Sequence, residues 1–215
     1  MNKKEDSLRK FFLLFLAWIP QVMAHPHAFI DMKIKLLVDE EKLTGFRMQW
    51  RLDEASSSEM LYDLVLAEGD ATAKQRLVDD VMKNVVAEHY FSYFFDKDNK
   101  KIKYKATPQN YGMRAQGTYL DYYFDVLLAT PQKLTANQFS LMTYDKTYYV
   151  AMLYPEPVRQ SVDFSALPAN CQGKLIEPNI DEKWRRYATS LDKSQRDTDD
   201  SLGTMFAQTI QIQCE

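Results

Sequence analysis

The sequence predicts an α+β protein, mainly an antiparallel β domain with two or three helices and a C-terminal segment closed by a disulfide. Short runs of alternating apolar and polar residues recur along most of the chain, which is typical of strands with one buried face. Between residues 56 and 91 the apolar positions change to helical spacing. Hydrophobic residues make up 46% and aromatic residues 13% of the chain, enough for a packed core and against a disordered chain.

Residues 1–24 are predicted to be a cleaved signal peptide. Four basic residues stand against two acidic ones before an uninterrupted apolar run at residues 11–19, and Val22 and Ala24 occupy the −3 and −1 positions before the cleavage point. The apolar run is shorter than the roughly 20 residues that span a bilayer, although an uncut membrane anchor is the alternative. We therefore expect a periplasmic protein that begins at His25 and is not membrane-inserted after cleavage.

The main domain is predicted to cover residues 25–167. Residues 28–38 alternate as a strand with Phe29 and Asp31 on one side, and residues 43–52 form a hairpin with it. A first helix follows, with a serine cap at residue 56.

A second helix is expected over residues 70–91, with Asp70 as its cap and His89 on its apolar stripe. Residues 111–154 read as a meander of antiparallel strands.

The C-terminal segment is predicted to cover residues 168–215. Two short strand-like pieces each carry one cysteine, Cys171 and Cys214, and the stretch between them is polar, helical at first and loose around residues 197–201. An even cysteine count in an exported chain favours a disulfide. A pair of soft metal ligands is the alternative, but neither cysteine has the CxxC spacing of a zinc site.

Charge and motifs exclude several classes of function. The formal net charge of −3 becomes about −5 once the signal's four basic and two acidic residues are removed, since −3 − (4 − 2) = −5. Such a chain, with no basic cluster, is not expected to bind nucleic acid. It has no nucleophile elbow, phosphate-binding loop, HExxH motif or dinucleotide fingerprint, and we predict that it is not an enzyme.

The expected mature N-terminus is a candidate metal site. His25 and His27 are two of the three histidines in the chain, and cleavage would add the α-amine of His25 to its ring. Pro26 has no amide hydrogen, so the square-planar amino-terminal chelate of copper and nickel cannot form. What remains is an imidazole pair suited to zinc, copper or nickel.

Acidic residues complete the candidate metal site. Asp31 lies four residues after His27 and would face the same side of a strand. Asp53 and Glu54 become neighbours if the first two strands pair, and Asp145 is an acid in an apolar strand context. The predicted ligands are His25, His27, Asp31, Asp53 and Asp145. A frayed terminus, with the acids pairing lysines or capping turns, is the alternative.

His89 is either a hydrogen-bonded core residue on its helix or a further ligand, and the sequence leaves both open.

Four segments resemble a known family: HPHAFID at the mature N-terminus, WRLDE, YDKTYYV and FAQTIQIQC. The family comprises bacterial periplasmic proteins of unknown function, described as the periplasmic component of an ABC-type transport system. Its members are commonly encoded beside nickel/cobalt-type permeases, and some are linked to zinc acquisition. The resemblance places His25, His27, Asp31, Asp53, Glu54 and Asp145 at matching positions. The acidic insert near Asp197 and the lack of a His-rich loop depart from the family pattern.

The sequence therefore predicts a periplasmic accessory protein that binds a transition metal, zinc first and copper or nickel as alternatives, and supports an inner-membrane metal permease. A copper site of the histidine-brace kind, with His89 as the distant imidazole, is one alternative. A structural or interaction module of the cell envelope without metal is the other.

Overall fold

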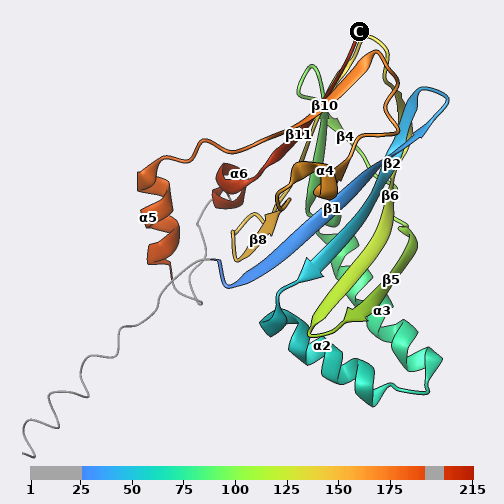
Figure 1. Ribbon diagram of the computed structural model, residues 1–215, viewed down its shortest axis with the longest axis vertical. Helices are drawn as coiled ribbons and strands as arrows, with labels where there is room; N and C mark the ends of the chain where they lie inside the picture. The colour runs from blue at the N-terminus through green and yellow to red at the C-terminus, as the bar shows by residue number, and fades with distance from the viewer. Residues whose placement is uncertain (1–25, 192–200) are drawn as a thin grey trace, which may run out of the picture.

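The computed structural model describes residues 26–191 and 201–215. Figure 1 shows long strands in two sheets, with two long helices across one end of the molecule. The α+β class with mainly β structure is confirmed. The predicted signal peptide, His25 and most of the segment expected to be loose, including Asp197, lie outside the described residues.

The first sheet has the strand order β5-β6-β2-β1-β8, and β9 also pairs with β1. The predicted hairpin of the first two strands is confirmed, because β1 and β2 are antiparallel with Ile30 opposite Leu52. The strands of this sheet are β1 (Ala28–Asp39), β2 (Lys42–Leu52), β5 (Gln109–Gln116), β6 (Tyr119–Lys133), β8 (Val150–Leu153) and β9 (Val162–Asp163).

The second sheet has the order β10-β11-β7-β3-β4. Its strands are β3 (Ser92–Asp96), β4 (Lys101–Ile102), β7 (Gln138–Thr143), β10 (Cys171–Ile176) and β11 (Thr209–Cys214). β10 and β11 come from the predicted C-terminal segment, and β11 pairs directly with β7 of the predicted main domain. The two predicted segments therefore share one sheet.

The core lies between the inner faces of the two sheets. Phe46 of β2 packs edge-on against Phe94 of β3 at 5.1 Å between ring centroids. The predicted alternation of β1 is confirmed, since Met32, Ile34 and Leu36 are buried and the residues between them are exposed. Burying these apolar side chains supplies about 25 cal/mol for each Å² removed from water.

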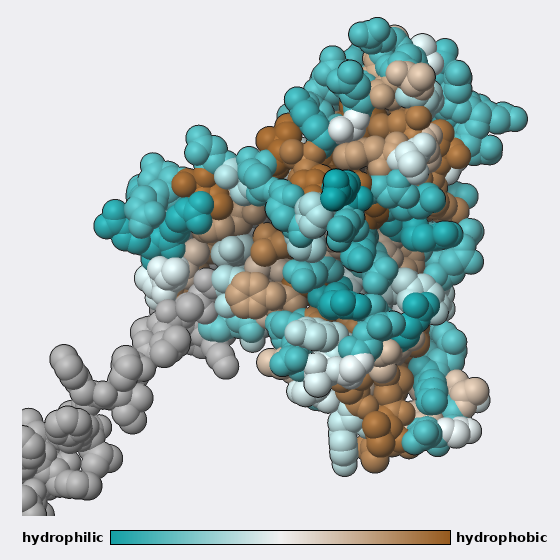
Figure 2. Space-filling view, viewed as in Figure 1, coloured by the Kyte–Doolittle hydropathy of each residue, from teal (hydrophilic) through white to brown (hydrophobic). Residues whose placement is uncertain are grey.

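The outer face of the first sheet is polar. Arg47 of β2 donates two hydrogen bonds to Asp125 of β6, at 2.8 and 2.9 Å, and Arg51 does the same to Asp121 at 2.7 and 2.9 Å. Figure 2 shows hydrophilic side chains over the region where Figure 1 places β1, β2 and β6. The sheet therefore has one apolar and one charged face, as its alternating strands predict.

The described residues contain five α-helices, whereas two or three were expected. The additional helices are short ones. The five helices are α2 (Glu54–Leu66), α3 (Ala71–Ala87), α4 (Val158–Ser161), α5 (Glu182–Ser190) and α6 (Leu202–Phe206). Asp70 caps α3 as predicted, accepting hydrogen bonds from Thr72 and Ala73. None of the helices in the described ranges is long and apolar enough to cross a membrane.

Helix α2 leaves an apolar surface uncovered. Tyr62, Val65 and Leu66 are each more than 60% exposed, and Figure 2 shows hydrophobic side chains at the end of the molecule where Figure 1 places this helix. We call these three residues the α2 patch.

The predicted meander over residues 111–154 is wrong in part. β5 and β6 form an antiparallel hairpin, but β7 lies in the other sheet and β8 runs parallel to β1. Alternation along a single strand shows which face is buried, whereas the choice of sheet and direction depends on packing between segments distant in the sequence.

Candidate metal centre

Asp53 connects the start of β1 to the start of α2. Its Oδ2 accepts a hydrogen bond from the main-chain N–H of Phe29 at 2.7 Å, and its own N–H donates to the Phe29 carbonyl at 3.0 Å. Its Oδ1 accepts from the N–H of Ser56 at 2.7 Å. Asp53 is therefore the helix cap, and the predicted serine cap at residue 56 is wrong, because an aspartate three residues earlier supplies the acceptor.

Hydrogen bonds keep Asp53 ionised. Burial raises the pKa of its carboxyl, but hydrogen bonds from main-chain groups of Ser56 and Phe29 act in the opposite direction, and the net pKa lies below its usual value. An acceptor-only carboxylate therefore bonds to the main chain of Phe29, two residues after His27 in the sequence.

His27 lies just before β1 and is fixed by Tyr149. The N–H of His27 donates to the Tyr149 carbonyl at 2.9 Å, and the N–H of Ala28 donates to the same oxygen at 3.3 Å. The imidazole and the Tyr149 ring lie 5.0 Å apart between centroids, and the Nε2 atom is shielded from solvent. His27 therefore belongs to the folded domain instead of a frayed terminus.

Asp145 lies in the turn after β7, so its prediction as a strand residue is wrong. Its Oδ1 accepts from the N–H of Thr147 at 3.1 Å, and its Oδ2 accepts from the Thr147 hydroxyl at 2.9 Å and from the N–H of Val150 at 3.1 Å. Val150 pairs with Ala28 of β1. Asp145 therefore shapes the turn that presents Tyr149 to His27.

Helix α6 supports this turn from the C-terminal part of the chain. The N–H of Gly203 donates to the Lys146 carbonyl at 2.9 Å. A Cβ atom at Gly203 would collide with the main-chain carbonyl of Asp145, so the close approach requires glycine.

Asp31 and Glu54 contact other partners. Asp31 is exposed on β1 opposite Arg51 of β2. The pKa of Arg51 is raised, first by its hydrogen bond to Asp121 and also by the charge of Asp31. Glu54 accepts a hydrogen bond from the Thr118 hydroxyl at 2.6 Å. The geometry thus places Asp31 in the polar outer face of the sheet and Glu54 beside the β5–β6 turn.

His89 is not on the apolar stripe of α3, contrary to the prediction. The helix ends at Ala87, and His89 has a left-handed backbone conformation and an exposed side chain. It lines a cavity whose other described residues include neither His27, Asp53 nor Asp145.

Cys171 and Cys214 form the predicted disulfide between β10 and β11. The alternative of two thiolate ligands is therefore wrong.

The structure brings three of the predicted residues, His27, Asp53 and Asp145, to the beginning of β1. Within residues 26–191 and 201–215, no group of three or more His, Cys, Asp and Glu side chains is arranged to hold a metal ion. His25, the other predicted imidazole, lies outside these ranges. Sequence reasoning missed Tyr149, which stands in the YDKTYYV segment but acquires its role only through the parallel pairing of β8 with β1.

The chain belongs to the family described as Protein of unknown function (DUF1007), which matches residues 10–214. It is 61% identical over 194 residues to a protein of Haemophilus influenzae described as an uncharacterized protein, covering 90% of this chain and 93% of that relative. No solved structure matches.

Proposed function

We propose that the mature protein binds a transition metal ion, zinc in preference to copper or nickel, through His25 and His27, and that it supports an inner-membrane metal permease from the periplasm. The observation that carries the proposal is the fixed position of His27. Its main chain bonds to Tyr149, which the Asp145 turn presents, while Asp53 anchors the main chain at Phe29.

The donor set fits this assignment. Neutral imidazoles suit zinc, copper and nickel, and a free α-amine at His25 would add a third nitrogen. The carboxylate oxygens of Asp53 and Asp145 each accept at least one hydrogen bond from the protein. We therefore assign these two acids to positioning the start of β1, and the direct ligands to the two histidines.

Calorimetric titration tests the metal site. Protein that begins at His25 is titrated separately with zinc, copper and nickel, and we expect zinc to bind with one-to-one stoichiometry. His27→Ala should weaken binding at least about tenfold, or about 1.4 kcal/mol. His89→Ala is the matched control, since its imidazole lines a different cavity. Absence of zinc binding, or equal affinity in His27→Ala, contradicts the proposal.

The same titration separates the histidine-brace alternative. Tight copper binding that is lost in His89→Ala would favour a brace and contradict the two-histidine site.

The transport role rests on the family resemblance and needs a cellular test. Deleting the gene should reduce zinc uptake in zinc-limited medium, and the wild-type protein should restore it, whereas a His27→Ala protein present at the same level should not. Restoration by His27→Ala would separate the transport role from the metal site.

A further inference from the structure

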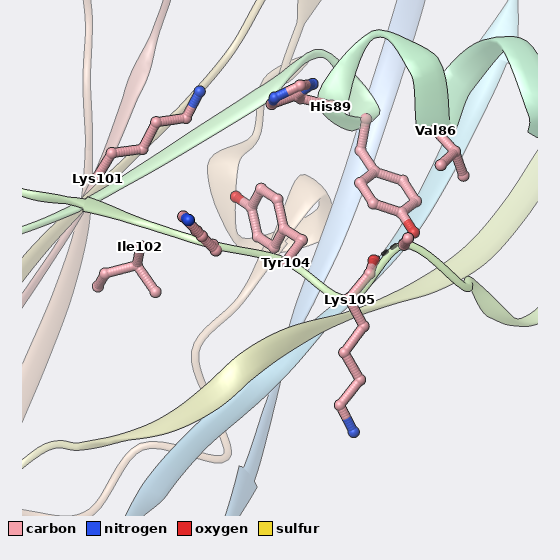
Figure 3. Close-up of a pocket in the computed structure, with 9 residues that line it drawn as sticks. Val86, His89, Lys101, Ile102, Tyr104 and Lys105 are labelled. Atoms are coloured by element: carbon pink, nitrogen blue, oxygen red, sulfur yellow. Dashed lines mark hydrogen bonds between the residues drawn. The ribbon is translucent and has the colours of Figure 1, made fainter.

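A cavity opens where α3 ends against the segment that follows β4. Its volume is about 390 Å³, within the range of small-molecule sites. Figure 3 shows the residues that line it. They are Val86, His89, Tyr90, Lys101, Ile102, Lys103, Tyr104, Lys105 and Ala106.

The lining combines an apolar floor with a cationic rim. Val86, Tyr90, Ile102 and Tyr104 supply hydrophobic and aromatic side chains, and the Tyr90 and Tyr104 rings meet edge-on at 5.8 Å between centroids. The described lining residues include three lysines and a histidine, but neither Asp nor Glu. This sign of charge favours an anion.

Not every lysine contributes to the rim. Figure 3 shows the Lys101 and His89 side chains on one side of the cavity, whereas the Lys105 side chain is directed away from it. The Lys105 carbonyl instead accepts a hydrogen bond from the Tyr90 hydroxyl at 2.9 Å.

The rim histidine is placed by a strained turn. His89, Tyr90 and Phe91 all have left-handed backbone angles, with φ of 54°, 57° and 49°. A left-handed residue other than glycine costs roughly 1–2 kcal/mol, and such strain persists where surrounding contacts enforce it. Here Tyr90 is only 2% exposed, and the Phe91 carbonyl accepts from the N–H of Tyr144 at 2.8 Å. If α3 continued beyond Ala87, His89 would lie on the surface of the helix. The left-handed turn instead places His89 at the cavity.

Tyr104, whose ring forms part of the floor, also has a buried hydroxyl. Its hydroxyl is shielded from solvent and has no hydrogen-bond partner among the described residues. Leaving such a group unpaired costs about 1–3 kcal/mol. Burial raises the pKa of Tyr104 well above its usual value, so the floor stays uncharged beneath the cationic rim.

We propose that this cavity binds a small aromatic carboxylate, with its ring against Tyr90 and Tyr104 and its charged end at Lys101, Lys103 and His89. An inorganic anion would leave the apolar floor unused, a neutral aromatic molecule would leave the rim unused, and a cation would be repelled by it. The site does not depend on the metal proposal, because the cavity contains neither His27, Asp53 nor Asp145.

Binding of 2-naphthoate, followed by its fluorescence and by calorimetry, tests the proposal. The neutral 2-naphthamide and the cationic 2-naphthylmethylamine have the same ring system. We expect the carboxylate to bind at least about tenfold more tightly than the cation, with the amide between them.

Matched variants locate the site. Lys101→Gln with Lys103→Gln should weaken 2-naphthoate binding by about tenfold or more. Lys74→Gln with Lys97→Gln removes the same charge from exposed positions outside the cavity and should leave the affinity unchanged. Ala106→Phe, which fills the cavity from an exposed position, should abolish binding of all three probes.

Three outcomes would overturn the proposal. The first is equal affinity for the three probes. The second is an equal loss of 2-naphthoate affinity in the two double lysine variants. The third is binding that survives Ala106→Phe but is lost in Leu66→Ser. The last result would place the probe on the α2 patch.

Discussion

Aspartates in this protein are distinguished by the groups that bond to them. Asp53 and Asp145 accept hydrogen bonds mainly from main-chain N–H groups and so fix backbone segments. Asp121 and Asp125 instead accept from arginine side chains on the outer face of the first sheet. The first kind sets local geometry at the candidate metal centre, whereas the second kind neutralises charge across neighbouring strands.

Asp53→Ala should destabilise the metal-free protein by about 0.5–2 kcal/mol, the usual cost of losing a helix cap. The loss should fall toward the upper end, because the same carboxylate also bonds to Phe29. Urea denaturation in the presence of a chelator measures the free energy of unfolding. Asp53→Ser, which can still cap the helix, should recover part of the loss. A stability loss in Asp53→Ser equal to that in Asp53→Ala would contradict the capping role.

Asp125 should contribute to the pH dependence of stability. Burial raises the pKa of Asp125, but hydrogen bonds from Arg47 and Asn110 and the charge of Arg47 outweigh it, so the folded pKa lies below the unfolded value. Its stabilising effect is therefore complete above the unfolded pKa, near 4, and is lost as the pH falls through the lower folded pKa.

Asp125→Asn should accordingly cost about 1 kcal/mol at neutral pH, a modest value because Arg47 is half exposed. The difference from wild type should shrink below about pH 4. Denaturation curves recorded from pH 7 to pH 3 test this, with Asp39→Asn in an exposed strand end as the control. A constant difference across this range would show that the lost contact does not depend on ionisation.

At the scale of elements, sequence patterns predict the buried face of a strand and the cap of a helix better than they predict which strands pair. The alternation of β1 and the cap at Asp70 follow from local chemistry and are confirmed. The parallel pairing of β8 with β1 joins residues about 120 positions apart in the chain, and nothing in either segment alone specifies it. Tyr149 therefore could not be assigned beside His27 from the sequence.

The end of α3 shows a second limit of prediction from the sequence. Its apolar spacing continues to His89, yet the backbone turns left-handed because Tyr90 is buried and bonds to Lys105. Helical periodicity cannot predict a turn that tertiary contacts impose on residues other than glycine.

The disulfide between β10 and β11 should stabilise the second sheet. It joins residues that face each other in the strand pair and are 43 positions apart. The loop-entropy relation assigns such a closure about 4 kcal/mol at most. Cys171→Ala with Cys214→Ala should lower the free energy of unfolding toward that limit, and adding a reductant to the wild type should reproduce the loss. An unchanged unfolding midpoint in both experiments would show that strand pairing alone determines stability here.

The whole molecule contributes to the position of His27. Segments from four parts of the chain converge there: the start of β1, Asp53 after β2, the turn of Asp145 and Tyr149, and Gly203 of α6. The segment that begins at His27 is therefore built into the fold, although the sequence alone is compatible with a frayed chain end there. In the proposed metal site the histidine before β1 is consequently pre-positioned, which lowers the entropy cost of binding.

We predict that metal affinity depends on the free N-terminus created by cleavage before His25. After this cleavage the α-amine and an imidazole belong to the same residue, His25. A Met placed before His25 moves the α-amine to the Met and separates it from the His25 imidazole. If the amine is a ligand, the Met-extended protein should bind zinc about tenfold or more weakly, since each tenfold is about 1.4 kcal/mol. Pro26→Ala should add square-planar copper or nickel chelation, because it restores the amide hydrogen that proline lacks. Titration of the cleaved, Met-extended and Pro26→Ala proteins decides between these effects. Equal zinc affinity in the first two would remove the amine from the proposed ligands and leave the imidazoles of His25 and His27.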